Sequence, residues 1–452
     1  MRILLLAPAV ACLLAAQLPA QDNTELLNRL RAMEDRVRAL EAEVQTLKAR
    51  QTVPAPTPPA TAAVPEAQPT APPAPAALPV YGGAAGGASK VFNPDISLIG
   101  DFVGAAGNSG NRPTPSLEMH ESELGLQAII DPYARGDVFI TFGEQGVSLE
   151  EGYLTFTSLP GALQLKVGKM RAAFGKVNTL HNHVLPWTDR PLVTQNLVGG
   201  EDGIDDAGLS LSRIIPAPGQ VFLEGTAQLF RGDSANLFQA ARRSDVSTVE
   251  HLRAYRDISE STNIDLGGSY AHGHSPYADG SNQLFGFDAT LRWKPLRRSI
   301  YHSFVGRTEL IWARTTAPSN VLAGATSSTV DLGPAYVAKP FGFYVSADYQ
   351  LGRRWFLGGR FDRSERAQCL GTDPETTNGG CNFYAFFGSS APSFTPPLLR
   401  DTGGSILLTY WPSEFSQVRG QLRRTQYGEG RTANELLLQL QFSMGAHGAH
   451  PF

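Results

Sequence analysis

The chain has 452 residues, of which 42% are hydrophobic and 18% are charged, and its mean hydropathy is −0.16. This composition excludes a chain that is disordered throughout. No unbroken apolar run of about 18 residues follows residue 20, which argues against a bundle of membrane-spanning helices. The 38 Lys and Arg against 42 Asp and Glu give a net charge of −4, which argues against a nucleic-acid partner.

The first segment, residues 1–20, has the features of a secretory signal peptide. Arg2 precedes an apolar stretch that ends near Leu18, and the small residue Ala20 comes directly before polar Gln21. We therefore predict cleavage after about Ala20. The alternative is a buried or membrane-spanning helix, which is disfavoured because the polar flank follows so soon.

Residues 21–51 carry the heptad pattern of a short coiled coil. The a positions hold Leu30, Val37 and Val44, and the d positions hold Leu26, Met33, Leu40 and Leu47. So narrow an apolar stripe is marginal alone, so we expect it to be buried against copies of itself, as a dimer or a trimer. The alternative is a single amphipathic helix that packs on another domain.

Residues 52–90 are dominated by Pro, Ala, Thr and Gly, which predicts a disordered, extended linker without a core. Residues 91–452 show runs in which apolar and polar residues alternate, and turn residues separate these runs. This pattern is typical of strands. The clearest run, 434–444, places Leu436, Leu438 and Leu440 on one face and Gln439 and Gln441 on the other. Sixteen such runs, from 95–105 to 434–444, predict an all-β region.

The connections between these runs alternate in length. Asp131-Pro132 and Pro412-Ser413-Glu414 are short turns, whereas 171–205 and 364–403 are long polar loops. This asymmetry is typical of an antiparallel transmembrane β-barrel, here with sixteen strands, whose sheet must close because lipid cannot satisfy an open edge. With a signal peptide, it predicts the bacterial outer membrane and its lipid as the surroundings, with the coiled coil in the periplasm. The alternative is a large soluble β-sandwich or propeller, although no blade-length repeat is present.

A barrel of this size with polar residues inside encloses an aqueous lumen. The simplest function is that of a porin for passive passage of small hydrophilic solutes, with anions such as phosphate among the candidates. The loop 171–205 is the candidate constriction. The candidate pore-lining residues are Lys166, Lys169, Arg171, Lys176, Arg190, Arg292, Arg307, Arg360, Arg419 and Arg423. The global charge does not select anions, so selectivity would depend on where these cations lie.

The alternative role for these arginines is pairing across the lumen with Asp288, Glu309, Asp348 and Asp362, which would stiffen the wall. A non-transporting structural or receptor protein, linked to the periplasm through its coiled coil, is the alternative function. The sequence contains no nucleophile elbow and no Ser-His-acid set, so we expect no enzymatic activity.

Several motifs carry a resemblance to a known family. They are Asp131-Pro132-Tyr133-Ala134-Arg135, then Glu150-Glu151-Gly152-Tyr153-Leu154-Thr155-Phe156, and then Leu159-Pro160-Gly161 with Val167-Gly168-Lys169 and Phe174-Gly175-Lys176. They resemble the phosphate-selective porin O/P superfamily over most of residues 95–452. His181-Asn182-His183 and Asp189-Arg190-Pro191-Leu192 resemble a subgroup often labelled zinc-regulated TonB-dependent outer-membrane receptors.

This resemblance implies a sixteen-stranded porin, and coiled-coil-bearing porins of similar build are trimers. We therefore expect a homotrimer held by the coiled coil and by the barrel walls. The residues between 52 and 94 leave no room for the separate globular plug that a receptor would carry. Phe452, after an alternating last strand, resembles the sorting signal of outer-membrane proteins and implies the barrel-assembly machinery as a partner.

Two histidines and two cysteines bear on metal binding and on a disulfide. His181 and His183 are weak metal candidates, since two imidazoles supply two ligands and a third would have to come from elsewhere. We therefore predict no metal and no other cofactor. Cys369 and Cys381 lie in one polar loop, which predicts a disulfide in an oxidising compartment.

Overall fold

The computed structural model describes residues 94–109, 115–144, 146–234, 237–276, 280–318, 321–323, 330–332, 335–366 and 398–445, together with Arg38. Several predictions therefore fall outside the described residues. They are the signal peptide, the coiled coil with all of its seam residues, the linker, the cysteine pair and Phe452. Of the coiled-coil segment, the structure describes Arg38 alone. Among the described residues, no helix is long and apolar enough to cross a membrane.

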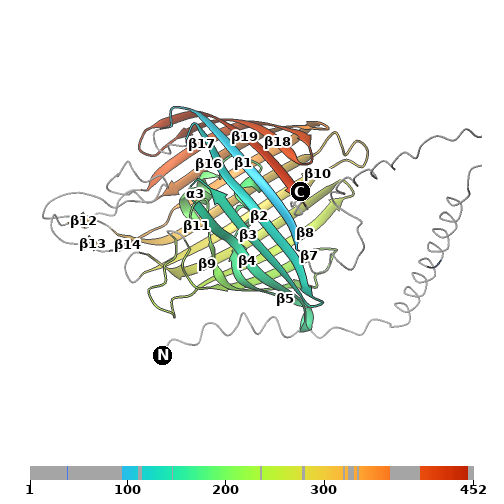
Figure 1. The fold of residues 1–452 in the computed structure, drawn as a ribbon. Helices are drawn as coiled ribbons and strands as arrows, with labels where there is room; N and C mark the ends of the chain where they lie inside the picture. The colour runs from blue at the N-terminus through green and yellow to red at the C-terminus, as the bar shows by residue number, and fades with distance from the viewer. Residues whose placement is uncertain are drawn as a thin grey trace, which may run out of the picture. The chain divides into compact units, whose positions relative to one another are not determined.

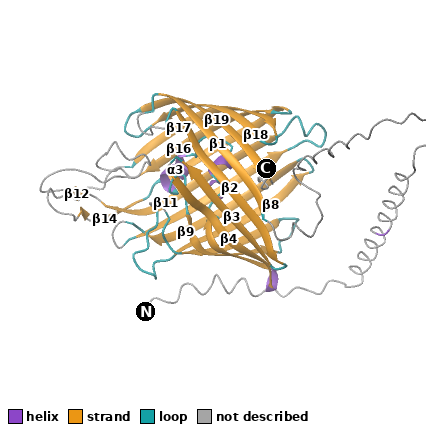
Figure 2. Ribbon diagram, viewed as in Figure 1, coloured by secondary structure: helices purple, strands orange, loops and turns teal. Residues whose placement is uncertain are grey.

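Strands account for most of the described chain (Figures 1 and 2). Sixteen of them form the main sheet: β1 (Asp95–Gly107), β2 (Leu117–Asp131), β3 (Ala134–Gly143), β4 (Gly146–Leu159), β5 (Leu163–Arg171), β6 (Asp205–Ile215), β7 (Phe222–Phe230), β8 (Ser247–Ser259), β9 (Thr262–His274), β10 (Ser281–Trp293), β11 (Phe304–Pro318), β15 (Phe341–Gly352), β16 (Trp355–Arg366), β17 (Leu399–Ser413), β18 (Ser416–Gln426) and β19 (Thr432–Gly445).

The sheet closes on itself. Each strand pairs antiparallel with its neighbour in the chain, and β19 returns to pair with β1, from Ser97 opposite Gly445 to Gly107 opposite Glu435. Three short strands stand apart from the ring. β14 (Ala335–Ala338) extends the pairing of β11, and β12 (Val321–Ala323) pairs with β13 (Val330–Leu332). The predicted closed, sixteen-stranded antiparallel barrel is thus confirmed for the described residues.

Helical turns are few in the part of the chain that the structure describes. The 3₁₀ turns are η1 (Pro160–Ala162), η2 (Val177–Thr179) and η3 (Asn182–Val184), and the α-helix α3 spans Leu192–Leu197. All but η1 lie in the connection between β5 and β6. Several strands run further than the sequence predicted: β17 begins at Leu399 rather than at residue 404, for example. The physical reason is that the ladder of backbone hydrogen bonds continues where the apolar alternation has already faded.

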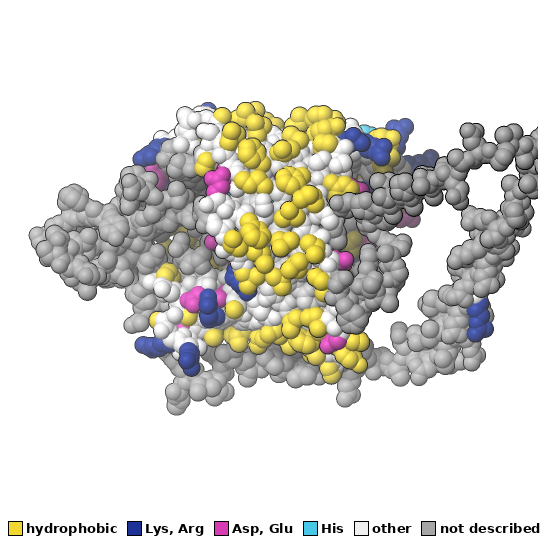
Figure 3. Space-filling model, viewed as in Figure 1, with side chains coloured by type: hydrophobic (Ala, Val, Ile, Leu, Met, Phe, Trp, Pro, Cys, Tyr) yellow, Lys and Arg dark blue, Asp and Glu magenta, His cyan; other side chains and the backbone are white. Residues whose placement is uncertain are grey.

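The outer face of the barrel is apolar. On β19, Leu438 and Leu440 are 52% and 48% exposed, whereas inward-facing Leu437 and Gln439 are 3% and 2% exposed. Figure 3 shows apolar side chains over much of the visible wall, with charged side chains mostly toward its ends. Aromatic side chains mark the rim with the short turns, among them Tyr133, Tyr301 and Trp355. An exposed apolar band flanked by aromatic residues is the surface that lipid requires of a barrel.

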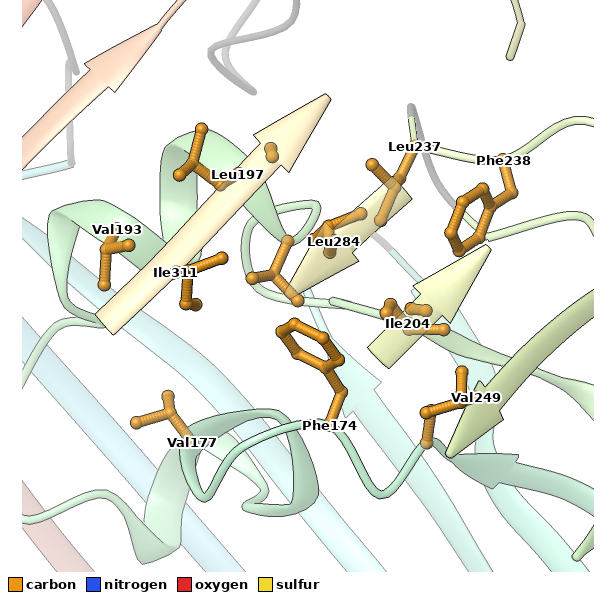
Figure 4. Close-up of a cluster of buried hydrophobic side chains, with 14 of the residues drawn as sticks. Phe174, Val177, Val193, Leu197, Ile204, Leu237, Phe238, Val249, Leu284 and Ile311 are labelled. Carbon is orange, nitrogen blue, oxygen red and sulfur yellow. The ribbon is translucent and has the colours of Figure 1, made fainter. Parts of the chain in front are cut away.

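A hydrophobic core lies inside the barrel rather than on its outer face. The connection between β5 and β6 supplies Phe174, Val177 and Trp187, which pack against inward-facing wall residues such as Leu284 and Ile311. Figure 4 shows Phe174 near the centre of this cluster. The connection between β7 and β8 adds the buried residues Leu237 and Phe238. Apolar side chains inside a polar-walled barrel indicate loops that are folded into the lumen.

Candidate functional site in the barrel lumen

Residues 172–204, which we call the inward loop, fold into the barrel. The loop leaves β5 through a tight turn at Gly175, whose φ of +59° is a left-handed conformation that favours glycine. A Cβ at this position would lie 3.1 Å from the carboxylate of Glu309 on β11. That carboxylate accepts the backbone N–H groups of Lys176 and Val177, at 2.5 and 2.7 Å. Glu309 thus caps the loop rather than pairing with an arginine across the lumen.

Two buried polar side chains set the internal shape of the inward loop. Asn178 donates to the carbonyls of Ala172 and Ile204, and accepts from the backbone N–H of Ile204 at 2.9 Å, which ties the two ends of the loop together. Arg190 is 1% exposed and donates to the carbonyls of Val177 and Leu180. Because buried backbone carbonyls need donors, Arg190 supports the fold of the loop instead of lining a passage.

Asp189 anchors the inward loop to the wall formed by β16 and β18. Its carboxylate pairs with Arg360 at 2.9 Å and with Arg423 at 2.6 Å, and accepts a hydrogen bond from Gln421. Burial alone would raise the pKa of the Asp189 carboxyl, but the charges of Arg360 and Arg423 outweigh it and hold that pKa well below its usual range. Asp189 is therefore ionised at neutral pH.

A histidine and carboxylate cluster anchors the loop to a second part of the wall, formed by β2 and β4. His181 Nδ1 lies 2.5 Å from Glu123 on β2, and its Nε2 lies 2.8 Å from Glu151 on β4. His183 lies 3.3 Å from Glu121 on β2. Burial would lower the pKa of His181, but its hydrogen bonds to Glu123 and Glu151 raise it to about 10.

The inward loop crosses the lumen from wall to wall. The loop forms hydrogen bonds with Gln228 on β7, Ser269 on β9, Asp401 on β17 and Gln441 on β19. These bonds add to its contacts with β2, β4, β11, β16 and β18. These contacts lie all around the ring of strands. At the level of the loop, therefore, the lumen is largely filled by protein.

One side of the lumen keeps partly exposed cations. Lys176, Arg253 and Arg292 gather around Asp265, with nitrogens 2.7, 2.9 and 3.9 Å from its carboxylate. Their side chains are 26%, 35% and 30% exposed, whereas Asp265 is fully buried. Arg307 pairs with Asp348 nearby and is 26% exposed. Although Glu224 is also partly exposed here, most of the accessible charge is positive.

The structure separates the ten basic residues predicted to line the pore into three groups. Lys176, Arg292 and Arg307 lie on the partly exposed side, and Lys166 rests over the Tyr153 ring at 4.4 Å. The other six form hydrogen bonds with groups of the inward loop or with residues directly beside its ends. They are Lys169, Arg171, Arg190, Arg360, Arg419 and Arg423.

Two sets of residues at the candidate site were not predicted from the sequence. Arg253 faces the lumen from β8, and its alternation with outward-facing Leu252 and Ala254 was the available signal. Glu121 and Glu123, which meet the histidines of the inward loop, are near neighbours on β2. Their partners lie about 60 residues further along the chain, so no local pattern pointed to them.

Comparison with known proteins gives similarity without a family assignment. No family model matches the chain. An uncharacterized protein of Aquifex aeolicus (strain VF5) is 27% identical over 418 residues, which cover 80% of this chain and 81% of that protein.

Among solved structures, OprB of Pseudomonas putida is similar with a TM-score of 0.48 and 12% identity, covering 79% of this chain and 95% of that one. OmpT, an outer membrane protein of Vibrio cholerae, has a TM-score of 0.47 and 8% identity, and the match covers 78% of this chain and 97% of that one. The outer membrane channel DcaP of Acinetobacter baumannii has a TM-score of 0.46 and 13% identity, and the match covers 78% of this chain and 96% of that one.

Proposed function

We propose that the chain is an outer-membrane channel for the passive passage of small hydrophilic solutes, and that the inward loop limits what passes. One observation carries this proposal: a closed barrel is apolar outside and polar inside, and one long loop crosses its lumen. A barrel with this surface is stable in lipid. Water-exposed side chains remain in the lumen around Lys176, Arg253, Arg292 and Arg307.

We propose further that anions are favoured over cations. The accessible charge on the open side of the lumen comes mainly from nitrogens, while Asp265, Asp288 and Glu309 are buried. In a narrow passage with low-dielectric walls, such a surface raises the local concentration of anions. Phosphate belongs to this class of solute, and so do small carboxylates.

The test is the reversal potential of single channels in a salt gradient across a planar bilayer. We expect anion preference in the unmodified protein, and a shift toward cations when Arg253 and Arg292 are both replaced by Gln. The matched control is Arg256→Gln, since Arg256 is exposed on β8 but does not share the face of Arg253. An unchanged reversal potential in the double variant would contradict the anion proposal and leave the channel proposal standing.

A second candidate is a non-transporting structural or receptor protein. The observation that favours it is the wall-to-wall packing of the inward loop, with buried anchors at Asp189 and at His181. This candidate predicts that a folded protein never conducts in a bilayer. It also predicts a weakened envelope, with normal solute uptake, in cells that produce the protein without residues 21–90.

The parts outside the described residues complete the proposal. The first strand begins and the last strand ends at the rim with the short turns, since Ser97 pairs with Gly445. This common rim supports a periplasmic coiled coil at 21–51 that joins three chains through the linker 52–90. We also propose a disulfide between Cys369 and Cys381, which a mass lower by about 2 Da than that of the reduced chain would reveal.

A further inference from the structure

The anchor between the inward loop and β2 has the composition of a metal site. His181, His183 and Glu123 each offer one ligand atom, and these atoms all lie within 4.8 Å of one another. His183 Nδ1 and His181 Nδ1 lie 3.6 and 2.5 Å from the same carboxylate oxygen of Glu123. The three residues are between 3% and 8% exposed. Two imidazoles and one carboxylate are the ligands of many zinc sites.

Rigid elements hold these three side chains. His181 directly precedes η3 and His183 lies within it, so this short turn presents both rings toward β2. Glu121 and Glu123 are two residues apart on β2, so both face the lumen. Ligands on a strand and on a tight turn keep their positions better than ligands on an extended loop.

A second observation points into the same cluster. Glu150 on β4 is 7% exposed, and its Oε2 has no hydrogen-bond partner among the described residues although its Oε1 pairs with Arg171. That unsatisfied oxygen lies 3.8 Å from His181 Nδ1. Because an unpaired buried carboxylate oxygen is costly, a cation close to Glu150 and His181 would relieve the cost.

The charges of the cluster suit a divalent ion. Four carboxylates, those of Glu121, Glu123, Glu150 and Glu151, lie around the two imidazoles, and Arg171 pairs with Glu150, so the carboxylates outnumber the imidazoles. A cavity of about 320 Å³ lies beside the cluster and is lined in part by Glu121 and Glu150.

We propose that His181, His183 and Glu123 bind one divalent transition-metal ion of the zinc class, with a carboxylate from Glu121, Glu150 or Glu151 as a further ligand. The bound ion joins the inward loop to β2, a wall strand other than those that hold Asp189. It is a structural ion, which fixes the position of the loop. The proposal is independent of the channel function, because the site forms whether or not the barrel conducts.

The test measures metal binding directly. The full chain, without an added histidine tag, is folded in detergent, stripped with a chelator and titrated with Zn²⁺ by calorimetry. Elemental analysis after gel filtration then counts the ions bound per chain. We expect one ion per chain, and we expect Co²⁺ to compete with Zn²⁺ for the site and to give a visible absorption band there.

Variants locate the ion. The double variant His181→Gln/His183→Gln should lose more than about 100-fold in affinity, since even outer-shell partners of a metal contribute about 10–100-fold. Glu123→Gln, which keeps the size of the side chain, should also weaken binding. The matched control is His272→Gln/His274→Gln, a pair with the same spacing on the outer face of β9. It should bind as the unmodified chain does.

Two results would overturn the proposal. The first is an unmodified, folded chain that binds no Zn²⁺ and gives no Co²⁺ band, which would make the cluster a set of ion pairs only. The second is unchanged binding in the folded double variant. Heat-modifiable electrophoretic mobility reports folding for every variant, and the Co²⁺ spectrum of the unmodified chain tests the proposal even if a variant does not fold.

Discussion

At the scale of single residues, the inward loop is held by charges that have little access to water. Asp189 lies between Arg360 and Arg423, each of which also has an acidic partner on its own wall, Asp362 and Glu435. Removing one member of a buried set leaves an uncompensated charge, which costs far more than an exposed pair contributes. The position of the loop therefore depends on a few residues.

Asp189→Asn should loosen the inward loop. The substitution removes the charge that balances Arg360 and Arg423, and losing a partner in a buried pair costs about 3–5 kcal/mol. We expect the free energy of unfolding in urea to fall by an amount of this order, and cleavage within the loop by a protease to become faster.

The matched control for this change is Asp233→Asn. Asp233 pairs with Arg231 at 3.1 Å, but the two side chains are 40% and 63% exposed. Exposed pairs contribute about 0–1 kcal/mol. Equal effects of the two substitutions would contradict the role given to Asp189.

Acid should release the same anchor. Since the folded-state pKa of Asp189 is depressed, the stabilisation is fully present above the ordinary aspartate pKa of about 3.9 and is lost as the pH falls through the lower, folded value. The protection of the inward-loop amides, expressed relative to their intrinsic exchange rate at each pH, should be alike at pH 7 and pH 5 and lower below about pH 3. An Asp189→Asn variant that kept this acid transition would assign it to another group.

At the scale of elements, the strands were predictable and the inside of the lumen was not. Alternation is a local pattern, and sixteen runs of it correspond to the sixteen strands because side chains on a strand point to opposite faces. The length of the inward loop, and its place after β5, also followed from the sequence.

The partners of the inward loop could not be found in the same way. Asp189 meets Arg360, which is 171 residues away, and Lys176 meets Glu309, which is 133 residues away. Such pairs depend on how the closed ring brings strands together, and nothing local encodes them. The histidine pair was recognisable, whereas its carboxylates on β2 became partners only through the fold.

Phe174→Ala should destabilise the packing of the inward loop. Phe174 is 1% exposed at the centre of the internal core. Removing its ring leaves a cavity, which lowers the free energy of unfolding by about 3–5 kcal/mol. The control is Phe287→Ala on β10, where the ring is 42% exposed on the outer face. Urea unfolding of both variants in the same detergent measures the difference, and a larger loss for Phe287→Ala would contradict the internal core.

At the scale of the whole molecule, the barrel reverses the usual arrangement of a soluble protein. Apolar side chains such as Leu438 and Leu440 face outward, while Gln439 and Gln441 face the lumen. The composition alone resembled that of an ordinary globular protein because the apolar residues are spread over alternate positions of one sheet.

Leu438→Arg should destabilise the barrel in a phospholipid bilayer by about 2–4 kcal/mol, the cost of a cation near the bilayer midplane. Leu296→Arg is the control, since Leu296 is 69% exposed in the connection 294–303, where the cost is about 0–1 kcal/mol. Unfolding of both variants from bilayers of a single phosphatidylcholine gives the comparison. Equal costs would contradict a lipid-facing position for β19.

The central claim is that the lumen conducts and that the inward loop limits the conductance. The most direct measurement is the single-channel conductance of the full chain in planar bilayers, beside a variant in which residues 179–200 are replaced by a short Gly-Ser segment. We expect small, steady conductance steps from the unmodified chain and larger steps from the variant. Folded proteins that give no steps in either form would contradict the channel, and equal steps would contradict the role of the loop.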